Sequence, residues 1–190
     1  GGRGQYGHVI LKLEPSEESE FVNECSPNDI PAEYISAIEE GIQEVRYSGS
    51  LAGFEVTRGR VILKGGSYHE VDSSDIAYKI AASRAFKEAY KKADPVILEP
   101  IMLVEVTVPK EYFGTVLDDI NSKRGEVIKV MHRGDVEVID SLIPLSNLFG
   151  YATTLRSLTS GRGVHHMQFE KYQPIPDKIL DKKLEEIRGY

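Results

Sequence analysis

Apolar and polar residues along the first half of the chain follow patterns typical of a mixed α+β domain. β-Branched and long apolar residues predict strands over residues 8–14 and 54–64, with a short partner strand over 21–24. Apolar residues recur every three or four positions from 35 to 45 and again from 76 to 86, as in helices with one buried face. The predicted order is β(β)αβα, in one domain.

Several residues in this half are expected to begin or end these elements. Pro31 suits the first position of the first helix, which Gly49 should end. The pair Gly65-Gly66 predicts a turn after the second long strand, and Asp72 or Ser73 should cap the next helix. The expected buried side of that helix is a row of four residues beside an alanine stripe: Ile76, Ile80, Ser83 and Phe86.

The second half of the chain alternates strand and helix patterns in a different order. Four strand patterns and two helical patterns follow one another: 101–108, 113–125 (helix), 126–131, 136–143, 145–155 (helix) and 165–172. This order, βαββαβ, predicts a split βαβ sandwich with four antiparallel strands and two helices on one face. Pro95 and Pro100 bracket the expected domain boundary, and Asp177 is expected to cap a final helix.

The composition and charge of the chain exclude some kinds of protein. Thirty acidic against 23 basic residues give a net charge of −7, which argues against a general nucleic-acid coat. The basic segment 58–64 would suit a local phosphate contact, although ordinary scatter of surface charge is the favoured explanation. The single Cys25 cannot form an internal disulfide, which fits a reducing compartment. No apolar stretch is long enough to cross a membrane, no secretory signal is present, and the start without Met predicts a piece of a longer protein.

The segment Gly2–Gly7 matches the pattern G-x-G-x-x-G. A dinucleotide fold needs a strand before this motif and a helix after it, whereas here a strand follows. With Val9 the segment also matches the glycine loop of protein kinases, but the other kinase motifs are absent, and so is a P-loop. The remaining interpretation is a flexible loop whose glycines let backbone amides and Arg3 approach a nucleic-acid backbone closely.

No constellation of residues in the sequence predicts catalysis. The adjacent His165 and His166 would point to opposite faces of a strand, and the other histidines have no partner at ligand spacing. A nucleophile elbow, G-x-S-x-G, is absent. His69 stands out because it lies in a polar loop outside any apolar pattern. Such a histidine is usually just solvated, but it can also stack or hydrogen-bond on RNA.

Several motifs, in order along the chain, resemble translation elongation factor G. They run from Gly1 to about Pro176 and comprise 1–9 (GGRGQYGHV), 30–35 (IPAEYI), 51–53 (LAG), 66–74 (GSYHEVDSS), 98–102 (LEPIM), 149–157 (FGYATTLRS) and 159–163 (TSGRG). The resemblance implies an α+β fold of two domains. Residues 1–97 would form the elongated, ribosomal-protein-like domain IV with a left-handed βαβ crossover. Residues 98–176 would form the ferredoxin-like βαββαβ domain V, and 177–190 a C-terminal helix.

The resemblance also implies a function, as the ribosome-binding C-terminal part of a cytoplasmic translational GTPase that promotes translocation. The tip of domain IV would enter the A site of the small subunit and contact tRNA, mRNA and rRNA. Domain V would contact the large subunit near the GTPase-associated centre and the sarcin–ricin loop. The matching tip positions are Gly1, Gly2, Arg3, Gly4, Gln5, Ser67, Tyr68, His69 and Glu70.

By the same resemblance, no catalytic, cofactor or metal site is expected in this chain. GTP and Mg²⁺ would bind the N-terminal domain of the parent protein, whose domains I to III are expected partners beside the ribosome. Residues 26–29 and 56–60 depart from the family pattern, which leaves open the main translocase, a second paralogue or a recycling factor. A tetracycline-type ribosome-protection protein fits less well, because its tip loops differ more. A free-standing RNA-binding module without a GTPase is a further alternative.

Overall fold

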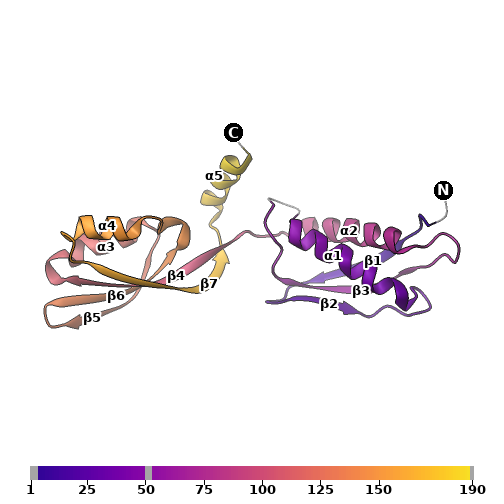
Figure 1. Ribbon diagram of the computed structural model, residues 1–190, viewed down its shortest axis with the longest axis horizontal. Helices are drawn as coiled ribbons and strands as arrows, with labels where there is room; N and C mark the ends of the chain where they lie inside the picture. The colour runs from indigo at the N-terminus through magenta and orange to yellow at the C-terminus, as the bar shows by residue number, and fades with distance from the viewer. Residues whose placement is uncertain (1–3, 50–52, 189–190) are drawn as a thin grey trace. The chain divides into compact units, whose positions relative to one another are not determined.

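The computed structural model describes residues 4–49 and 53–188 and shows a mixed α+β chain (Figure 1). It divides into two compact units, Gly1–Pro95 with Leu184–Tyr190, and Val96–Lys183. The described residues contain seven strands and five α-helices: β1 His8–Glu14, β2 Ser19–Asn23, α1 Ile35–Ser48, β3 Gly59–Ser67, α2 Asp75–Lys92, β4 Leu98–Pro109, α3 Phe113–Ser122, β5 Glu126–Arg133, β6 Val136–Pro144, α4 Tyr151–Leu158, β7 Val164–Pro174 and α5 Asp177–Arg188.

The first unit is a three-stranded sheet in the order β1-β3-β2, with α1 and α2 on one face (Figure 1). β1 runs antiparallel to β3, and β2 runs parallel to it. Neighbouring parallel strands need a crossover connection, which here is α1, between β2 and β3. The expected βαβ crossover is therefore confirmed, while its hand stays a prediction.

Strand β3 differs from the sequence prediction at both ends. It begins at Gly59 instead of residue 54, because the Val56 N–H donates to the Arg46 carbonyl in α1 at 2.8 Å and not to the sheet. It also continues through Gly65-Gly66, where a turn was expected. A Cβ on Gly66 would lie 2.1 Å from the His8 carbonyl oxygen. The glycine is therefore required by the close approach of β1, and the turn prediction was wrong.

The helix starts also differ from the predictions. Pro31 precedes a 3₁₀ turn, Ala32–Tyr34, so α1 begins only at Ile35, whereas Gly49 ends it as expected, with φ of 67°. Ser74, and neither Asp72 nor Ser73, caps α2: its hydroxyl accepts the Ala77 N–H at 3.2 Å. The cap was therefore predicted one or two residues too early.

Helix α2 is rotated relative to the predicted buried face. It buries Tyr78, Ala82 and Phe86, whereas Ile76 is 71% and Ile80 47% exposed. The rotation follows from a close contact with α1, since a Cβ on Gly41 would lie 2.3 Å from the Lys79 carbonyl oxygen. The expected row was therefore wrong for the two isoleucines and correct for Phe86.

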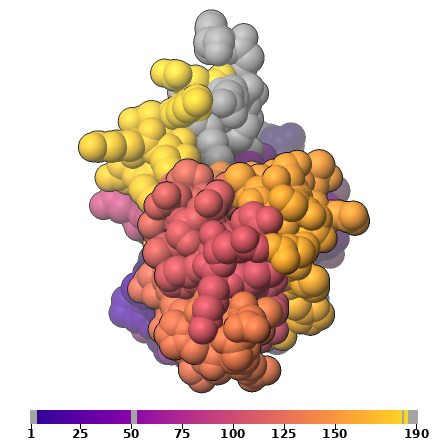
Figure 2. All heavy atoms as spheres, turned by 90° about the vertical axis from the view of Figure 1, so that its left-hand side faces the viewer, coloured from indigo at the N-terminus to yellow at the C-terminus, as the bar shows by residue number. Residues whose placement is uncertain are grey.

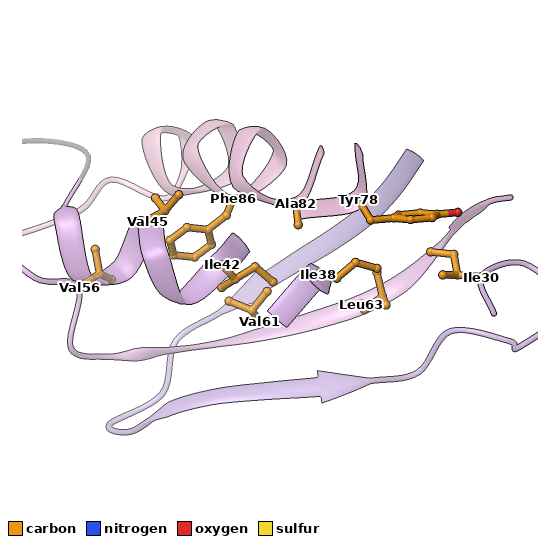
Figure 3. Close-up of a cluster of buried hydrophobic side chains, with 10 residues drawn as sticks. All are labelled: Ile30, Ile38, Ile42, Val45, Val56, Val61, Leu63, Tyr78, Ala82 and Phe86. Atoms are coloured by element: carbon orange, nitrogen blue, oxygen red, sulfur yellow. The ribbon is translucent and has the colours of Figure 1, made fainter. Parts of the chain in front are cut away.

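The core of the first unit fills the space between the two helices and the sheet (Figure 3). Its buried members are Ile30, Ile38, Ile42, Val45, Val56, Val61, Leu63, Tyr78, Ala82 and Phe86. The buried guanidinium of Arg46 lies 5.3 Å from the centroid of the Phe86 ring and donates to the Gly59 carbonyl at 2.6 Å. Burial lowers the pKa of this guanidinium. Arg46 thereby ties the start of β3 to α1.

The second unit is a four-stranded antiparallel sheet in the order β5-β6-β4-β7. Helices α3 and α4 cover one face of this sheet (Figure 1) and lie side by side in the space-filling view of Figure 2. Val104, Val106 and Ile139 of the sheet pack with Val116 of α3 and Leu155 of α4. The predicted βαββαβ sandwich, and with it the α+β fold class, is confirmed.

The last described element, α5, begins at Asp177, which is its first residue and not its cap. The amides of Ile179 and Leu180 donate to the Pro176 carbonyl at 2.9 and 3.0 Å, so the chain turns into the helix directly after a proline. Within the described part of the chain, every helix is too short or too polar to cross a bilayer.

Candidate nucleic-acid interface

Two segments that are about sixty residues apart in the sequence meet at one end of the first unit (Figure 1). One is the glycine-rich segment before β1, and the other is the loop 67–73 between β3 and α2. The Tyr6 amide donates to the Asp72 carbonyl at 2.7 Å, and Tyr6 pairs with Ser73 in an isolated parallel bridge. We call this end of the unit, residues 4–8 with 67–74, the tip.

Glycines allow the first segment to lie directly on α2. A Cβ on Gly7 would lie 2.6 Å from the carbonyl carbon and oxygen of Ala77, which are backbone atoms. Gly4 has φ of 77°, a conformation that favours glycine, and its carbonyl accepts the Ser74 hydroxyl at 2.5 Å. Ser74 therefore caps α2 and also holds the glycine-rich segment.

Side-chain hydrogen bonds converge on Ser67 at the end of β3. Its hydroxyl lies 2.5 Å from the Tyr6 hydroxyl and 2.8 Å from Nδ1 of His8, and its carbonyl accepts the Tyr78 hydroxyl at 2.7 Å. Burial raises the pKa of Tyr78. Tyr6 and His8 are two residues apart on an extended segment, so they reach the same face. The sequence analysis missed both, although this spacing was visible.

The loop that carries His69 is closed by backbone and side-chain hydrogen bonds. The His69 amide donates to the Ser73 hydroxyl at 3.0 Å, and the Ser73 amide donates to the His69 carbonyl at 3.0 Å. The Asp72 amide donates to Nδ1 of His69 at 3.2 Å. The side chain of His69 nevertheless remains 54% exposed. The loop is therefore an ordered support that presents one imidazole to the surroundings.

A row of tyrosine rings supports the loop from beneath. The ring centroids of Tyr34 and Tyr78 are 4.8 Å apart, and those of Tyr34 and Tyr68 are 5.9 Å apart. Tyr78 is fully buried, while Tyr68 is 38% exposed at the surface of the tip. The row thus connects the core of the unit to one of the predicted contact residues.

A hollow of about 550 Å³ lies beside the glycine-rich segment, against α2. It is lined by Gly4, Gln5, Gly7, Ile76, Ala77, Ile80, Ala81 and Arg84. Among the side chains that the structure describes, no carboxylate forms an ion pair with Arg84. The flank of the tip therefore combines accessible backbone, apolar side chains and one positive charge.

The basic segment 58–64 is neutralised by glutamates that lie on β2 or directly before or after it. Arg58 pairs with Glu17 at 3.1 Å and Arg60 with Glu20 at 2.5 Å, and Lys64 pairs with Glu24. Because β2 lies alongside β3 in parallel register, acids and bases of similar spacing meet across the two strands. This pairing supports the simpler interpretation of the segment as ordinary surface charge.

Comparison with known proteins identifies the family. The family model for elongation factor G, domain IV, matches residues 1–94, and the model for the elongation factor G C-terminus matches residues 96–183. The chain belongs to the elongation factor G family. Elongation factor G of Thermotoga neapolitana is 55% identical over 96% of this chain and 27% of the relative, and that of Thermotoga maritima is 54% identical over the same shares. The chain thus spans about a quarter of the length of these curated relatives.

A solved structure gives the same family fold. The crystal structure of a protein from Thermus thermophilus is 41% identical, with a TM-score of 0.88, and the match covers 100% of this chain and 29% of that one. The family resemblance read from the sequence motifs is therefore confirmed. Both units belong to the C-terminal part of elongation factor G.

The nine predicted tip residues fall into three groups in this elongation factor G fragment. Gly1, Gly2 and Arg3 lie outside the described residues. Gly4 and Ser67 are partly buried and hold the tip together. The remaining four are exposed on it: Gln5, Tyr68, His69 and Glu70. The structure brings the six described residues to one end of the unit, while their contacts with RNA stay a prediction.

The second unit places its histidines apart from one another. The ring of His165 lies 5.1 Å from that of Tyr151, on the helix-covered face, and His166 lies opposite Glu105 on β4. His132 pairs with the buried Glu137. In the described part of the chain, no three His, Cys, Asp or Glu side chains are grouped to hold a metal ion. The turn Arg133-Gly134-Asp135 joins β5 to β6, with Gly134 at φ of 61°.

Proposed function

We propose that this chain is the ribosome-binding C-terminal part of a translational GTPase that promotes tRNA–mRNA translocation in the cytoplasm. Residues 1–97 act as domain IV, 98–176 as domain V and 177–190 as a C-terminal helix. The tip of domain IV, with Gly1, Gly2 and Arg3 included, enters the A site of the small subunit. There it contacts tRNA, mRNA and rRNA and blocks the return of the tRNA.

The observation that carries this proposal is the joining of two distant segments into one tip. The exposed His69 and Tyr68 offer an imidazole and a ring, which are groups suited to stack or hydrogen-bond on unpaired nucleotides. The glycine-rich segment offers a backbone that can approach a phosphate chain closely. The basic side chains of segment 58–64 already form ion pairs with glutamates. The contact with RNA therefore depends on shape and hydrogen bonds more than on net positive charge.

The chain alone is proposed to carry no enzymatic activity. GTP and Mg²⁺ bind the N-terminal domain of the parent, and domains I to III with the ribosome are the partners of this fragment. Purified chain mixed with labelled GTP should therefore release no phosphate above the blank. Turnover at a rate far above the blank would contradict this division of labour.

The decisive experiment replaces His69 with Ala in the full-length factor and measures single-round translocation. We expect the rate to fall about fivefold, the size of one net hydrogen bond or stacking contact. His166→Ala, on an exposed residue of β7, is the matched control and should leave the rate unchanged. A wild-type rate in His69→Ala would remove His69 from the mechanism. A parent that splits ribosomal subunits without translocating would instead place the chain in a recycling paralogue.

A further inference from the structure

Tyr6 contacts the His69 loop in three separate ways. Its amide donates to the Asp72 carbonyl at 2.7 Å, its hydroxyl lies 2.5 Å from the Ser67 hydroxyl, and its ring centroid is 6.0 Å from that of His69. The first contact fixes the backbone of Tyr6, and the second restricts rotation of its ring. The ring therefore forms a fixed wall beside the imidazole.

The other side of the imidazole is held by the Asp72 amide. An amide can only donate, so Nδ1 of His69 must offer its lone pair, and the proton of the neutral ring lies on Nε2. The Asp72 carboxylate lies 3.4 Å from the same Nδ1. Within residues 4–49 and 53–188, Nε2 has no hydrogen-bond partner. His69 thus presents, at the surface of the tip, an N–H donor that no described residue accepts.

We infer that Tyr6 is the positioning residue of the tip, which holds the His69 ring so that Nε2–H meets an oxygen acceptor of RNA. The acceptor can be a phosphate, a ribose hydroxyl or a base carbonyl, all of which accept a hydrogen bond. This inference rests on the proposed function for its RNA partner. The positioning itself depends only on contacts within the chain.

Hydrogen exchange in the 190-residue chain tests the positioning without a ribosome. In Tyr6→Ala the Asp72 amide should exchange about fivefold faster and match His69→Ala, because its acceptor Nδ1 moves away. Tyr6→Phe keeps the ring but loses its hydrogen bond to Ser67, so exchange at Asp72 should fall between wild type and Tyr6→Ala. The Ser73 amide, which donates to the His69 carbonyl, should not change in any of these variants. Tyr47→Ala, an exposed tyrosine on α1, is the matched control.

Two results would overturn the inference. One is an unchanged Asp72 amide in Tyr6→Ala. The other is equal acceleration at Asp72 and Ser73, which would mean that Tyr6 only stabilises the loop as a whole.

Single-round translocation with the full-length factor then links the position to the function. Tyr6→Ala should slow translocation about fivefold, and the double variant with His69→Ala should be no slower than His69→Ala alone, because Tyr6 acts through that ring. Additive losses would overturn the inference. If the exchange result holds while His69→Ala translocates normally, the positioning stands and the proposed role of the tip fails.

Discussion

In the first unit the ion pairs lie on the surface, whereas two ion pairs of the second unit are largely buried. Arg60 and Glu20 have side chains 44% and 35% exposed, and the neighbouring pairs of this sheet are similar. In the second unit, Arg124 donates to both oxygens of Glu99, at 2.7 and 2.8 Å, and Glu99 is only 4% exposed. Lys123 and Asp119 are 18% and 12% exposed.

This difference in the exposure of the ion pairs determines how much each pair contributes to the stability of its unit. Exposed pairs contribute little, because water screens them and side-chain entropy opposes them. The first unit also has close backbone contacts at glycines, such as Gly66 on β1 and Gly41 on α2, and one buried cation, Arg46, which donates to backbone carbonyls. The second unit contains buried charged groups, and removing the partner of one of them would leave an uncompensated charge in the interior. Substitutions should therefore affect the two units in different ways.

The largest effect is expected at the buried pair of the second unit. Arg124→Ala leaves the Glu99 carboxylate buried without its cation, which should lower the free energy of unfolding of this unit by about 3–5 kcal/mol. Urea unfolding followed by the amide signals of residues 98–174 measures it. The double variant Arg124→Met/Glu99→Leu removes both charges and should recover most of the loss. A loss below about 1 kcal/mol in Arg124→Ala would contradict the role of burial.

A somewhat smaller loss is expected from a side chain at Gly66 in the first unit. The Cβ in Gly66→Ala would meet the His8 carbonyl oxygen and a methyl of Ile30, so β1 must move, at a cost of about 2–3 kcal/mol. Gly114→Ala is the control, because nothing lies within 4 Å of its Cβ. In the helix α3 this change should be neutral or stabilise by about 0.5–1 kcal/mol. Equal effects in the two variants would refute the importance of the close contact.

A pH dependence is expected in the second unit because of Tyr151. Burial, and after it the charge of Asp119, raises the pKa of this buried tyrosine to about 12, against an ordinary 10.0. Because the folded state favours the neutral hydroxyl, the contribution of Tyr151 to the free energy of unfolding is fully present below pH 10. It falls by about 2 kcal/mol as the pH rises toward 12. Urea unfolding at pH 8 and pH 11 measures the slope. Tyr151→Phe should reduce it, and an identical slope in that variant would assign the loss to other groups.

The smallest effect is expected for the surface pairs. Arg60→Ala breaks the contact with Glu20 and should lower the free energy of unfolding only slightly, and by even less in high salt. Urea unfolding at low and high salt, followed by the amide signals of residues 8–92, measures it. A loss that is independent of salt and as large as that of Arg124→Ala would contradict the contrast between the two units.

Much of the tip could be anticipated from the sequence, but its internal support could not. The motifs around Gly4 and His69 pointed to two polar, glycine-rich segments outside the core pattern. Their hydrogen bonds through Tyr6, Ser67 and Ser74 join residues about sixty or seventy positions apart, and no local pattern encodes such a distance. For the same reason the pairing of Arg60 with Glu20 became visible only once β2 and β3 lay in register.

The order of strands and helices was determined by the sequence itself, because periodicity of two or of three to four depends only on neighbours along the chain. The βαββαβ order of the second unit and the end of α1 at Gly49 are examples. Only the tertiary structure decided which face of α2 is buried and where β3 starts and ends. Those features depend on how closely two backbones approach, as at Gly41 and Gly66, and on Arg46 drawing the start of β3 toward α1.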